Sequence, residues 1–325
     1  MFWINSIRHK GSNALIRYPR AQYPLAYICS KWALFKGLFS RQVVGHDEPK
    51  FLFIVSCGRS GTTLLRRLLV ENYAIYIPPE TYILSRLVST FLRMSSLSWE
   101  EKVSLAISSF QYHHEFYTFG PIDLKLVHNR AISVSHHERS LGIIVRIFFE
   151  ELAKLNQIDC EWFGDKTPMY FGSLGLIQSI FPSAKFVHIV RDPADVISSI
   201  VSMGQHGDAE SAAFRWRKSI NAWHAFKKSL PAGRSLEITY EKLVTDTEST
   251  LEIIQKVFGL PKRKAMISVG HSLQDVHAHE HLKNVLKPVK PDNIGKGRAK
   301  LSNEERAQIR PITNKLAQHY GYEPI

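Results

Sequence analysis

A glycine-containing turn near residue 58 carries the residue types of an anion site. The apolar run Phe51–Val55 before it is typical of a short buried strand, and the leucines after Thr63 recur at helical spacing. The turn itself reads Cys57-Gly58-Arg59-Ser60-Gly61-Thr62-Thr63. In a strand, loop and helix of this kind, the loop amides and the helix N-terminus point at one place, where negative charge is favoured. The pattern therefore predicts a phosphate-binding loop.

The chemistry of this loop differs from that of a nucleoside triphosphatase. Such a loop places a lysine directly after its last glycine, whereas Thr62 follows Gly61 here and the positive charge stands earlier, on Arg59. A second strand-like run, 184–190, ends in Arg191 rather than in the carboxylate that holds magnesium in those enzymes. We therefore expect a phosphate site that needs no Mg²⁺.

A second anion site is expected around Arg191. Ser199 follows it by eight residues, about two turns along the next helix, so that a guanidinium fork and a hydroxyl could share one phosphate. The alternative is a structural ion pair of Arg191 with Asp192 or Asp195. Lys296 and Arg298 would close over the same ligand from a late loop, or form a solvated basic loop.

Further segments complete a set of motifs that runs in order from about residue 51 to residue 325. They are Glu80-Thr81, Asp165-Lys166-Thr167-Pro168, Phe186-Val187-His188-Ile189-Val190-Arg191-Asp192-Pro193-Ala194-Asp195-Val196-Ile197-Ser198-Ser199, Tyr240-Glu241-Lys242-Leu243, Val285-Leu286-Lys287-Pro288-Val289 and Gly321-Tyr322-Glu323-Pro324. Together with the loop, this set resembles the sulfotransferase family, and within it the tyrosylprotein-type sulfotransferases and their bacterial relatives. Residues 1–50 and about 90–160 carry no such motif.

The resemblance implies a donor nucleotide, 3′-phosphoadenosine 5′-phosphosulfate (PAPS). It implies that the loop binds the 5′-phosphosulfate and that Tyr240 lies near the adenine. The full set of implied nucleotide-binding residues is Arg59, Ser60, Gly61, Thr62, Thr63, Arg191, Ser199, Tyr240 and Lys296.

The resemblance also implies three catalytic residues. Glu80 would take the proton from an acceptor hydroxyl, while Arg59 and Lys166 would stabilise the charge that develops on the leaving phosphate. His281 is the rival base, since it stands where the subgroup has a serine. Lys166 could instead pair only with Asp165 or another nearby acid.

Other departures from the subgroup concern the acceptor and the compartment. Met203 and Gly297 replace an arginine and an aromatic residue, and the cysteines of a disulfide are absent near Pro78 and Asp165. We therefore predict the acceptor only as a hydroxyl compound: a glycan, a lipid, a small metabolite or a peptide tyrosine. The alternatives to sulfuryl transfer are a kinase-like phosphotransferase and a non-catalytic nucleotide-binding protein.

Strand-like runs that alternate with helical patterns predict an α/β fold: a P-loop-type, largely parallel sheet flanked by helices, in a single domain with helical insertions. We expect the sulfotransferase domain to span 51–325, with helices at about 193–203 and 247–258. The box Ser302-Asn303-Glu304-Glu305 opens a C-terminal helix that Pro311 kinks or interrupts. Trp216 and Trp223 are assigned to the core.

Charge and composition limit which binding partners are expected. The net charge is +13, and residues 1–50 and 261–300 together carry +12 of it. Residues 1–50 are expected to form a basic, helical N-terminal extension, in which the stripe over 25–39 either docks on the core or contacts an anionic membrane surface. Three scattered cysteines, without a signal or spanning segment, predict a cytoplasmic protein. No nucleic acid or metal is expected as a partner, and a homodimer stays open.

Overall fold

The computed structural model describes residues 50–204, 208–264 and 273–325. Five parallel strands in these ranges form one sheet with the order β2-β3-β1-β4-β5. The strands are β1 (Lys50–Val55), β2 (Ile75–Tyr76), β3 (Trp162–Asp165), β4 (Lys185–Val190) and β5 (Ser235–Thr239). The predicted α/β class with a parallel sheet is confirmed. The boundaries of β1 and β4 differ by one residue from the predicted runs 51–55 and 184–190, whereas β2 and β3 were not predicted.

The central strand β1 is buried on both of its faces. All its residues from Phe51 to Val55 are at most 2% exposed, as expected for a parallel sheet that helices cover on both sides. Its register aligns Phe53 with Asp165 of β3 and Val55 with His188 of β4. The carboxyl ends of these strands therefore meet at one edge of the sheet.

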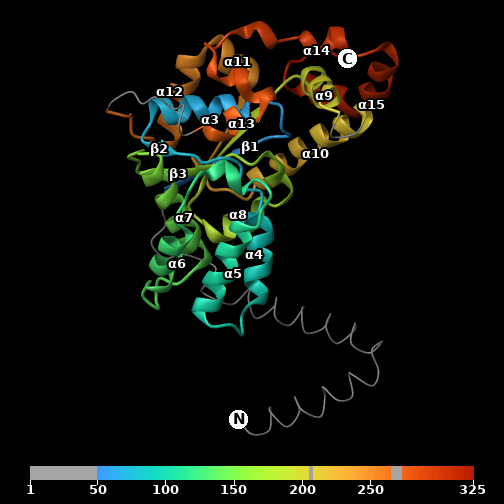
Figure 1. Ribbon diagram of the computed structural model, residues 1–325. Coiled ribbons are helices and arrows are strands. Elements are labelled where there is room, and N and C mark those ends of the chain that lie inside the picture. The colour runs from blue at the N-terminus through green and yellow to red at the C-terminus, as the bar shows by residue number, and fades with distance from the viewer. Residues whose placement is uncertain (1–49, 205–207, 265–272) are drawn as a thin grey trace, which may run out of the picture.

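Helices cover both faces of the sheet. In Figure 1, α3 and α12 lie above it, and α7 and α8 lie below it. The α-helices of the described ranges are α3 (Thr62–Asn72), α4 (Leu84–Arg93), α5 (Trp99–Gln111), α6 (Leu124–Ile132), α7 (Leu141–Leu155), α8 (Leu174–Ile180), α9 (Pro193–Ser202), α10 (Ala209–Lys227), α11 (Tyr240–Thr245), α12 (Thr247–Phe258), α13 (Gln274–Ala278), α14 (Lys296–Lys300) and α15 (Asn303–His319). Short 3₁₀ turns are η2 (Phe116–Phe119), η3 (Pro168–Gly172), η5 (Glu280–Leu286) and η6 (Pro291–Asn293).

The segment without motifs, about 90–160, is largely helical. It supplies most of α4 to α7, which lie between β2 and β3 in the chain. Ser98 caps α5 with a full capping box, and the Ser140 hydroxyl accepts from Ile143 N to begin α7. Buried aromatic rings hold this layer together and join it to the sheet: Phe110 of α5 stacks on Phe148 of α7 at 4.1 Å between centroids, and Phe149 of α7 lies 5.6 Å from Phe51 of β1.

A second hydrophobic cluster joins α9, α10 and α15. Trp216 and Trp223 of α10 are 1% and 0% exposed, which confirms their assignment to the core. The capping box at Ser302 is confirmed, but Pro311 does not interrupt α15, which continues to His319. The carbonyl that loses its helical donor to Pro311 belongs to Ala307, which is exposed to solvent, while Ile312 packs inward.

The predicted N-terminal extension, with its stripe over 25–39, lies outside the described residues. Cys57 and Cys160 are free thiols. Among the described helices, none is both long and apolar enough to cross a bilayer.

Gly164 of β3 tests the packing of the sheet. A Cβ at this position would lie 2.6 Å from the carbonyl oxygen of Leu52 and 2.9 Å from Ile77 Cγ1. We expect Gly164→Ala to lower the free energy of unfolding by about 1–3 kcal/mol, because backbone on the neighbouring strand must shift. Denaturant titration measures the change.

The matched control is Gly175→Ala in α8, where nothing lies within 4 Å of an added Cβ. That variant should gain about 0.5–1 kcal/mol from helix propensity. Equal stabilities for the two alanine variants would contradict the close approach of β1 and β3.

Candidate active site

The carboxyl ends of all five strands deliver a predicted site residue to the same edge of the sheet. Arg59 follows β1, Glu80 follows β2, Lys166 follows β3, Arg191 follows β4 and Tyr240 follows β5. In open parallel α/β sheets, ligands bind in the crevice outside these ends. The topology therefore gathers residues from across the chain at one place.

The loop after β1 has the backbone of an anion cradle. Gly58, Arg59 and Gly61 have φ of 89°, 57° and 87°, which turns successive amides toward the same side. A Cβ at Gly61 would lie 2.4 Å from Tyr240 Cδ2, so glycine is required where the tyrosine ring packs. The hydroxyl of Ser60 donates to the carbonyl of Gly58 at 3.2 Å, and Ser60 does not line the cavity described below.

Arg59 lies at the centre of the site. Its Nε donates to the hydroxyl of Ser199 at 3.1 Å, and its carbonyl accepts from Arg191 at 3.2 Å. Burial first, and then the charge of Arg191, lower the pKa of the Arg59 guanidinium, while the charge of Glu80 raises it. The arginine therefore stands between the predicted second anion site and the predicted base.

Arg191 is held on several sides. It lies over the ring of Tyr240 with 4.2 Å from Cζ to the centroid, and it donates to the carbonyl of Asn293 at 2.5 Å. It also pairs with Asp195 at 3.3 Å, as the structural alternative expected. Its Nε is buried without a hydrogen-bond partner, so the ion pair leaves a donor for a further acceptor.

Asp195 ties the late loop to α9. Its two carboxylate oxygens accept from the amides of Gly295 at 2.9 Å and Gly297 at 2.6 Å. A Cβ at Gly297 would lie 2.2 Å from the carbonyl oxygen of Ala194, so this position has no room for the aromatic residue of the subgroup. This close packing brings Lys296 to the wall of the cavity.

The expectation that Arg298 closes over the nucleotide is wrong in this structure. Arg298 donates to Asp192 at 3.0 Å and to the carbonyls of Pro324 at 2.8 Å and Glu323 at 2.5 Å. Three of the five N–H donors of the guanidinium are therefore bonded within the protein, and the residue fastens the C-terminal segment instead of lining the cavity.

Glu80 and Lys166 form an ion pair. The Lys166 side chain is fully buried, and the Glu80 side chain is 20% exposed. Of the alternatives left open for Lys166, the nearby acid is thus Glu80 itself and not Asp165. The predicted base and a predicted cation are in direct contact.

A buried hydrogen-bond network positions Glu80. The next residue, Thr81, donates its hydroxyl to Asp165 at 2.6 Å, and its amide donates to the Thr167 hydroxyl at 3.0 Å. The hydroxyls of Thr81 and Tyr170 lie 2.7 Å apart. Burial raises the pKa of Asp165 to about 6, although its hydrogen bonds oppose this.

These residues surround a cavity of about 1110 Å³. The predicted site residues that line it are Arg59, Gly61, Thr62, Thr63, Glu80, Arg191, Ser199, Tyr240 and Lys296. Ser60 and Lys166 are not among its lining residues.

Residues that the sequence reading missed also line the cavity. They are three lysines, Lys287, Lys290 and Lys300, and the polar residues Tyr82, His114, Glu115 and His279. Lys287 lies in a quoted motif and could have been found there, whereas Glu115 lies in the segment without motifs. The side chain of His281, the rival base, lies outside the described residues.

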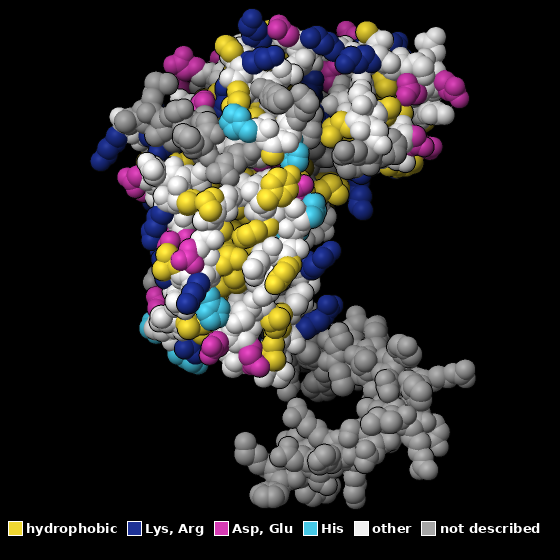
Figure 2. All heavy atoms as spheres, in the orientation of Figure 1, with side chains coloured by type: hydrophobic (Ala, Val, Ile, Leu, Met, Phe, Trp, Pro, Cys, Tyr) yellow, Lys and Arg dark blue, Asp and Glu magenta, His cyan; other side chains and the backbone are white. Residues whose placement is uncertain are grey.

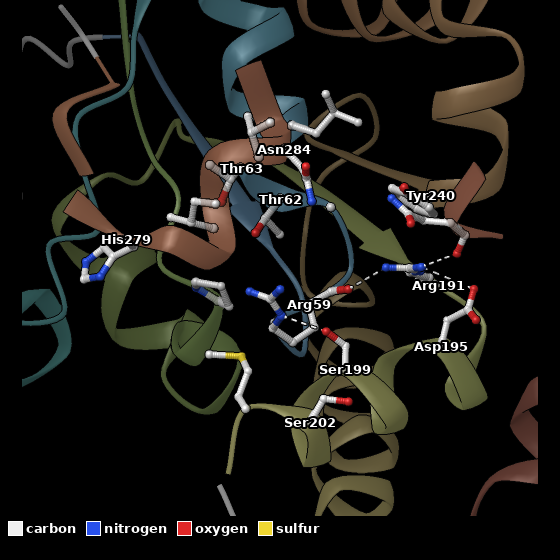
Figure 3. Close-up of a pocket in the computed structure, with 18 of the residues that line it drawn as sticks. Arg59, Thr62, Thr63, Arg191, Asp195, Ser199, Ser202, Tyr240, His279 and Asn284 are labelled. Carbon is white, nitrogen blue, oxygen red and sulfur yellow. Dashed lines mark hydrogen bonds and ion pairs between the residues drawn. The ribbon is translucent and has the colours of Figure 1, made fainter. Parts of the chain in front are cut away.

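The close-up in Figure 3 shows how the labelled residues are spread along the cavity. Figure 3 shows Arg191 and Asp195 at one end, His279 at the other, and Arg59 and Thr62 between them. Within the described residues, no group of three or more His, Cys, Asp or Glu side chains could hold a metal ion.

Comparison with known families gives the class of the protein. The model described as "Sulfotransferase family" matches residues 49–264. The chain belongs to the sulfotransferase family. As a sulfotransferase, it transfers a sulfuryl group to a hydroxyl-bearing acceptor.

Named relatives are remote. Protein-tyrosine sulfotransferase 1 of Danio rerio is 23% identical, over 87% of this sulfotransferase and 74% of that protein. Protein-tyrosine sulfotransferase A of Caenorhabditis elegans is 20% identical, over 84% and 67%.

Solved structures share the fold. The sulfotransferase domain from the Synechococcus PCC 7002 olefin synthase superposes with a TM-score of 0.57 at 22% identity, over 86% of this chain and 98% of that one. The sulfotransferase domain from the curacin biosynthetic pathway gives 0.50 at 19% identity, over 85% and 99%.

Asp165 predicts a pH dependence of the stability of this sulfotransferase. Its folded-state pKa of about 6 lies above the value of about 3.9 for an unfolded aspartate. As the pH rises from 4 to 6, the unfolded chain therefore loses this proton before the folded one does, and the free energy of unfolding falls.

Asp165→Asn keeps an oxygen that can accept from Thr81 and removes the titration. From pH 4 to pH 7, the free energy of unfolding should fall by about 1–3 kcal/mol less in the variant than in the wild type. Urea titrations of both proteins at the two pH values measure this difference, and parallel pH profiles would contradict the raised pKa.

Proposed function

We propose that this sulfotransferase uses PAPS as its donor and that Glu80 is the general base. The observation that carries the proposal is one cavity with two cationic sites for anions, at the loop before α3 and at Arg191. A donor with a 5′-phosphosulfate and a 3′-phosphate needs two such sites. The sulfotransferase family of the chain supports the same donor.

The loop suits the 5′-phosphosulfate. Amides of a left-handed loop, the N-terminus of α3 and the hydroxyls of Thr62 and Thr63 can all donate to its oxygens. No magnesium ion is needed, because Arg59 supplies positive charge within the loop.

The 3′-phosphate suits Arg191, Ser199 and the late loop. The unpartnered Nε of Arg191 is a charged donor for which the protein supplies no acceptor. Lys296, which Asp195 holds against the cavity through Gly295 and Gly297, adds a second cation. Tyr240 closes this end and stacks under the guanidinium.

Catalysis follows from the Glu80–Lys166 pair. The acceptor hydroxyl gives its proton to Glu80, and its oxygen attacks the sulfur while the bond from sulfur to the bridging phosphate oxygen breaks. Protonation cancels the charge of Glu80 and releases the Lys166 ammonium from its partner. Arg59, which lines the cavity, stabilises the negative charge that develops on the leaving oxygen. Lys166, whose buried side chain does not line the cavity, adds its charge from behind Glu80 once their ion pair is broken.

We further propose that residues 51–325 act as one catalytic unit, since Arg59 and Lys296 line the same cavity. A kinase-like reaction is disfavoured, because Arg298 and the amide of Ala194 engage Asp192, the carboxylate that follows Arg191. That carboxylate is therefore committed to structure.

Ligand binding tests the donor. Adenosine 3′,5′-bisphosphate (PAP) without Mg²⁺ should raise the melting temperature more than ATP with Mg²⁺ does. Arg191→Ala should weaken binding of PAP by about 1.5–3 kcal/mol and binding of adenosine 5′-phosphate much less, because only PAP has the 3′-phosphate. Titration calorimetry measures both affinities.

Arg298→Ala is the matched control, because it removes a nearby guanidinium that lies outside the cavity wall. It should lower stability without changing the preference for PAP. Stabilisation by ATP with Mg²⁺ alone would favour a phosphotransferase, and a response only to oligonucleotides would favour a nucleic-acid-binding protein. Equal losses of both adenosine ligands in Arg191→Ala would make Arg191 structural.

Glu80→Gln tests the base. The amide keeps the shape of the side chain and removes its basicity, so turnover should fall about 10²–10⁴-fold while the affinity for PAP changes little. Single-turnover assays with labelled PAPS, combined with PAP titration, separate the two effects.

The same assay on His281→Ala decides between the two candidate bases. Near-normal turnover in Glu80→Gln, together with loss of turnover in His281→Ala, would assign the proton transfer to the histidine.

A further inference from the structure

The end of the cavity opposite Arg191 has room for a second ligand. Pockets for one small ligand have volumes of about 300–1,000 Å³, and this cavity reaches about 1110 Å³. Figure 3 places His279 at that end, away from Arg191 and Asp195. Glu80, the proposed base, lines the same cavity. This end is therefore the place for the acceptor, and its chemistry indicates which acceptor fits.

Glu115 is the central polar group of the acceptor end. Its two carboxylate oxygens lie 3.4 Å from His279 Nε2 and 3.6 Å from His114 Nε2. Its side chain is 20% exposed and lines the cavity. The amide of Glu115 donates to His113 Nδ1 at 3.2 Å, and its carbonyl accepts from the Thr118 hydroxyl at 2.7 Å. The carboxylate is thus held at the cavity wall by its own backbone.

Tyr82 provides an aromatic wall beside this carboxylate. It has a φ of 55°, which costs energy for a tyrosine and is characteristic of functional sites. Its ring stacks on His113 at 5.4 Å between centroids, and 39% of the residue is exposed. The pKa of its hydroxyl is raised by burial first and then by the carboxylates of Glu80 and Glu115, so the hydroxyl lies among acidic groups.

The charges of the cavity wall are unevenly distributed along the chain, since Lys287, Lys290, Lys296 and Lys300 all come from its late segment. In Figure 2, lysine and arginine side chains lie along the upper edge and both margins of the face, while hydrophobic side chains occupy its centre. The described lining residues within 80–82, 114–118 and 279 include no lysine or arginine. Lys166, the partner of Glu80, does not line the cavity, and Glu115 lies beside the histidines His279 and His114. An acceptor with carboxylates near its hydroxyl would therefore meet the Glu115 carboxylate with no lysine or arginine of these ranges beside it.

An apolar alcohol fits equally badly, because it would cover the Glu115 carboxylate without donating a hydrogen bond to it. A molecule with several neighbouring hydroxyls removes this penalty. One hydroxyl can face Glu80 while the next ones donate to the two oxygens of Glu115, and the carbon face of a ring can pack on Tyr82.

We propose that Glu115 and Tyr82 form the acceptor site and that the acceptor is an uncharged, polyhydroxylated molecule of the sugar class. This inference rests on the proposed function, since it needs Glu80 as the base and the nucleotide at the Arg191 end. Glu115 acts on binding and orientation of the acceptor, whereas Glu80 carries the chemistry.

Three acceptors that share one aromatic aglycone test the charge preference with labelled PAPS: a glucoside, a glucuronide and a glucosaminide. We expect kcat/KM for the glucoside to exceed that for the glucuronide by about tenfold or more. A glycolipid with the same sugar in phosphatidylcholine vesicles distinguishes a membrane-borne sugar from a soluble one, and turnover of either supports the sugar class.

Glu115→Gln tests the residue. It should raise KM for the glucoside about tenfold, change kcat much less, and narrow the discrimination against the glucuronide. Glu252→Gln, on the exposed side of α12, is the matched control and should behave like the wild type. PAP titration of all variants should give unchanged affinities.

The inference is overturned if an acidic tyrosyl peptide, the glucuronide or the glucosaminide is the preferred acceptor. It is also overturned if no glycoside reacts, or if Glu115→Gln leaves KM and the discrimination unchanged. In each of these cases PAP still binds, so the proposed function survives. Loss of PAP binding by the wild type would instead refute the proposed function itself.

Discussion

The fully buried ammonium of Lys166 is the constraint on which the site depends. A buried charge without a partner costs several kcal/mol, so the fold must bring a carboxylate to it. That carboxylate is Glu80, which the chain delivers after β2, the neighbour of β3 in the sheet. The network of Thr81, Asp165 and Thr167 fixes the backbone next to Glu80. The same contacts that satisfy Lys166 thereby place an acid–base group and a cation side by side.

Asp195 positions the loop that contains Gly295 and Gly297 in a similar way. One carboxylate accepts from two amides of that loop and pairs with Arg191, so the anion site after β4 and the loop that carries Lys296 are positioned together. The close contact of Gly297 with the backbone of Ala194 fixes how near this loop packs to α9. Stability and ligand geometry depend here on the same few polar atoms.

The cavity is electrically divided. Lys296 and Lys300 of α14, with Arg191 paired to Asp195 of α9, line one part of the cavity, whereas Glu115, which directly precedes η2, lines the part near His279. A highly anionic donor and an uncharged acceptor would each find a complementary end, with Arg59 between them. This uneven charge would fix which end of the cavity each ligand occupies, because each ligand is disfavoured at the other end.

Local sequence determined the loop and most of the strands. Phe51–Val55 and the glycines at 58 and 61 are contiguous, and their conformations follow from residue type and spacing alone. The resemblance to sulfotransferases added Glu80 and Lys166, whose roles no local pattern contains. The continuity of α15 through Pro311 was not predictable, because it depends on which side of the helix faces solvent.

The tertiary structure alone decided the contacts between distant residues. Arg59 meets Ser199 across 140 residues of chain, and Arg298 turns to the C-terminal carbonyls instead of the cavity. Glu115 and His279 approach each other from segments of which one carries no motif at all. Local propensity reaches only a few residues along the chain, so such pairs become visible only when packing has brought their elements together.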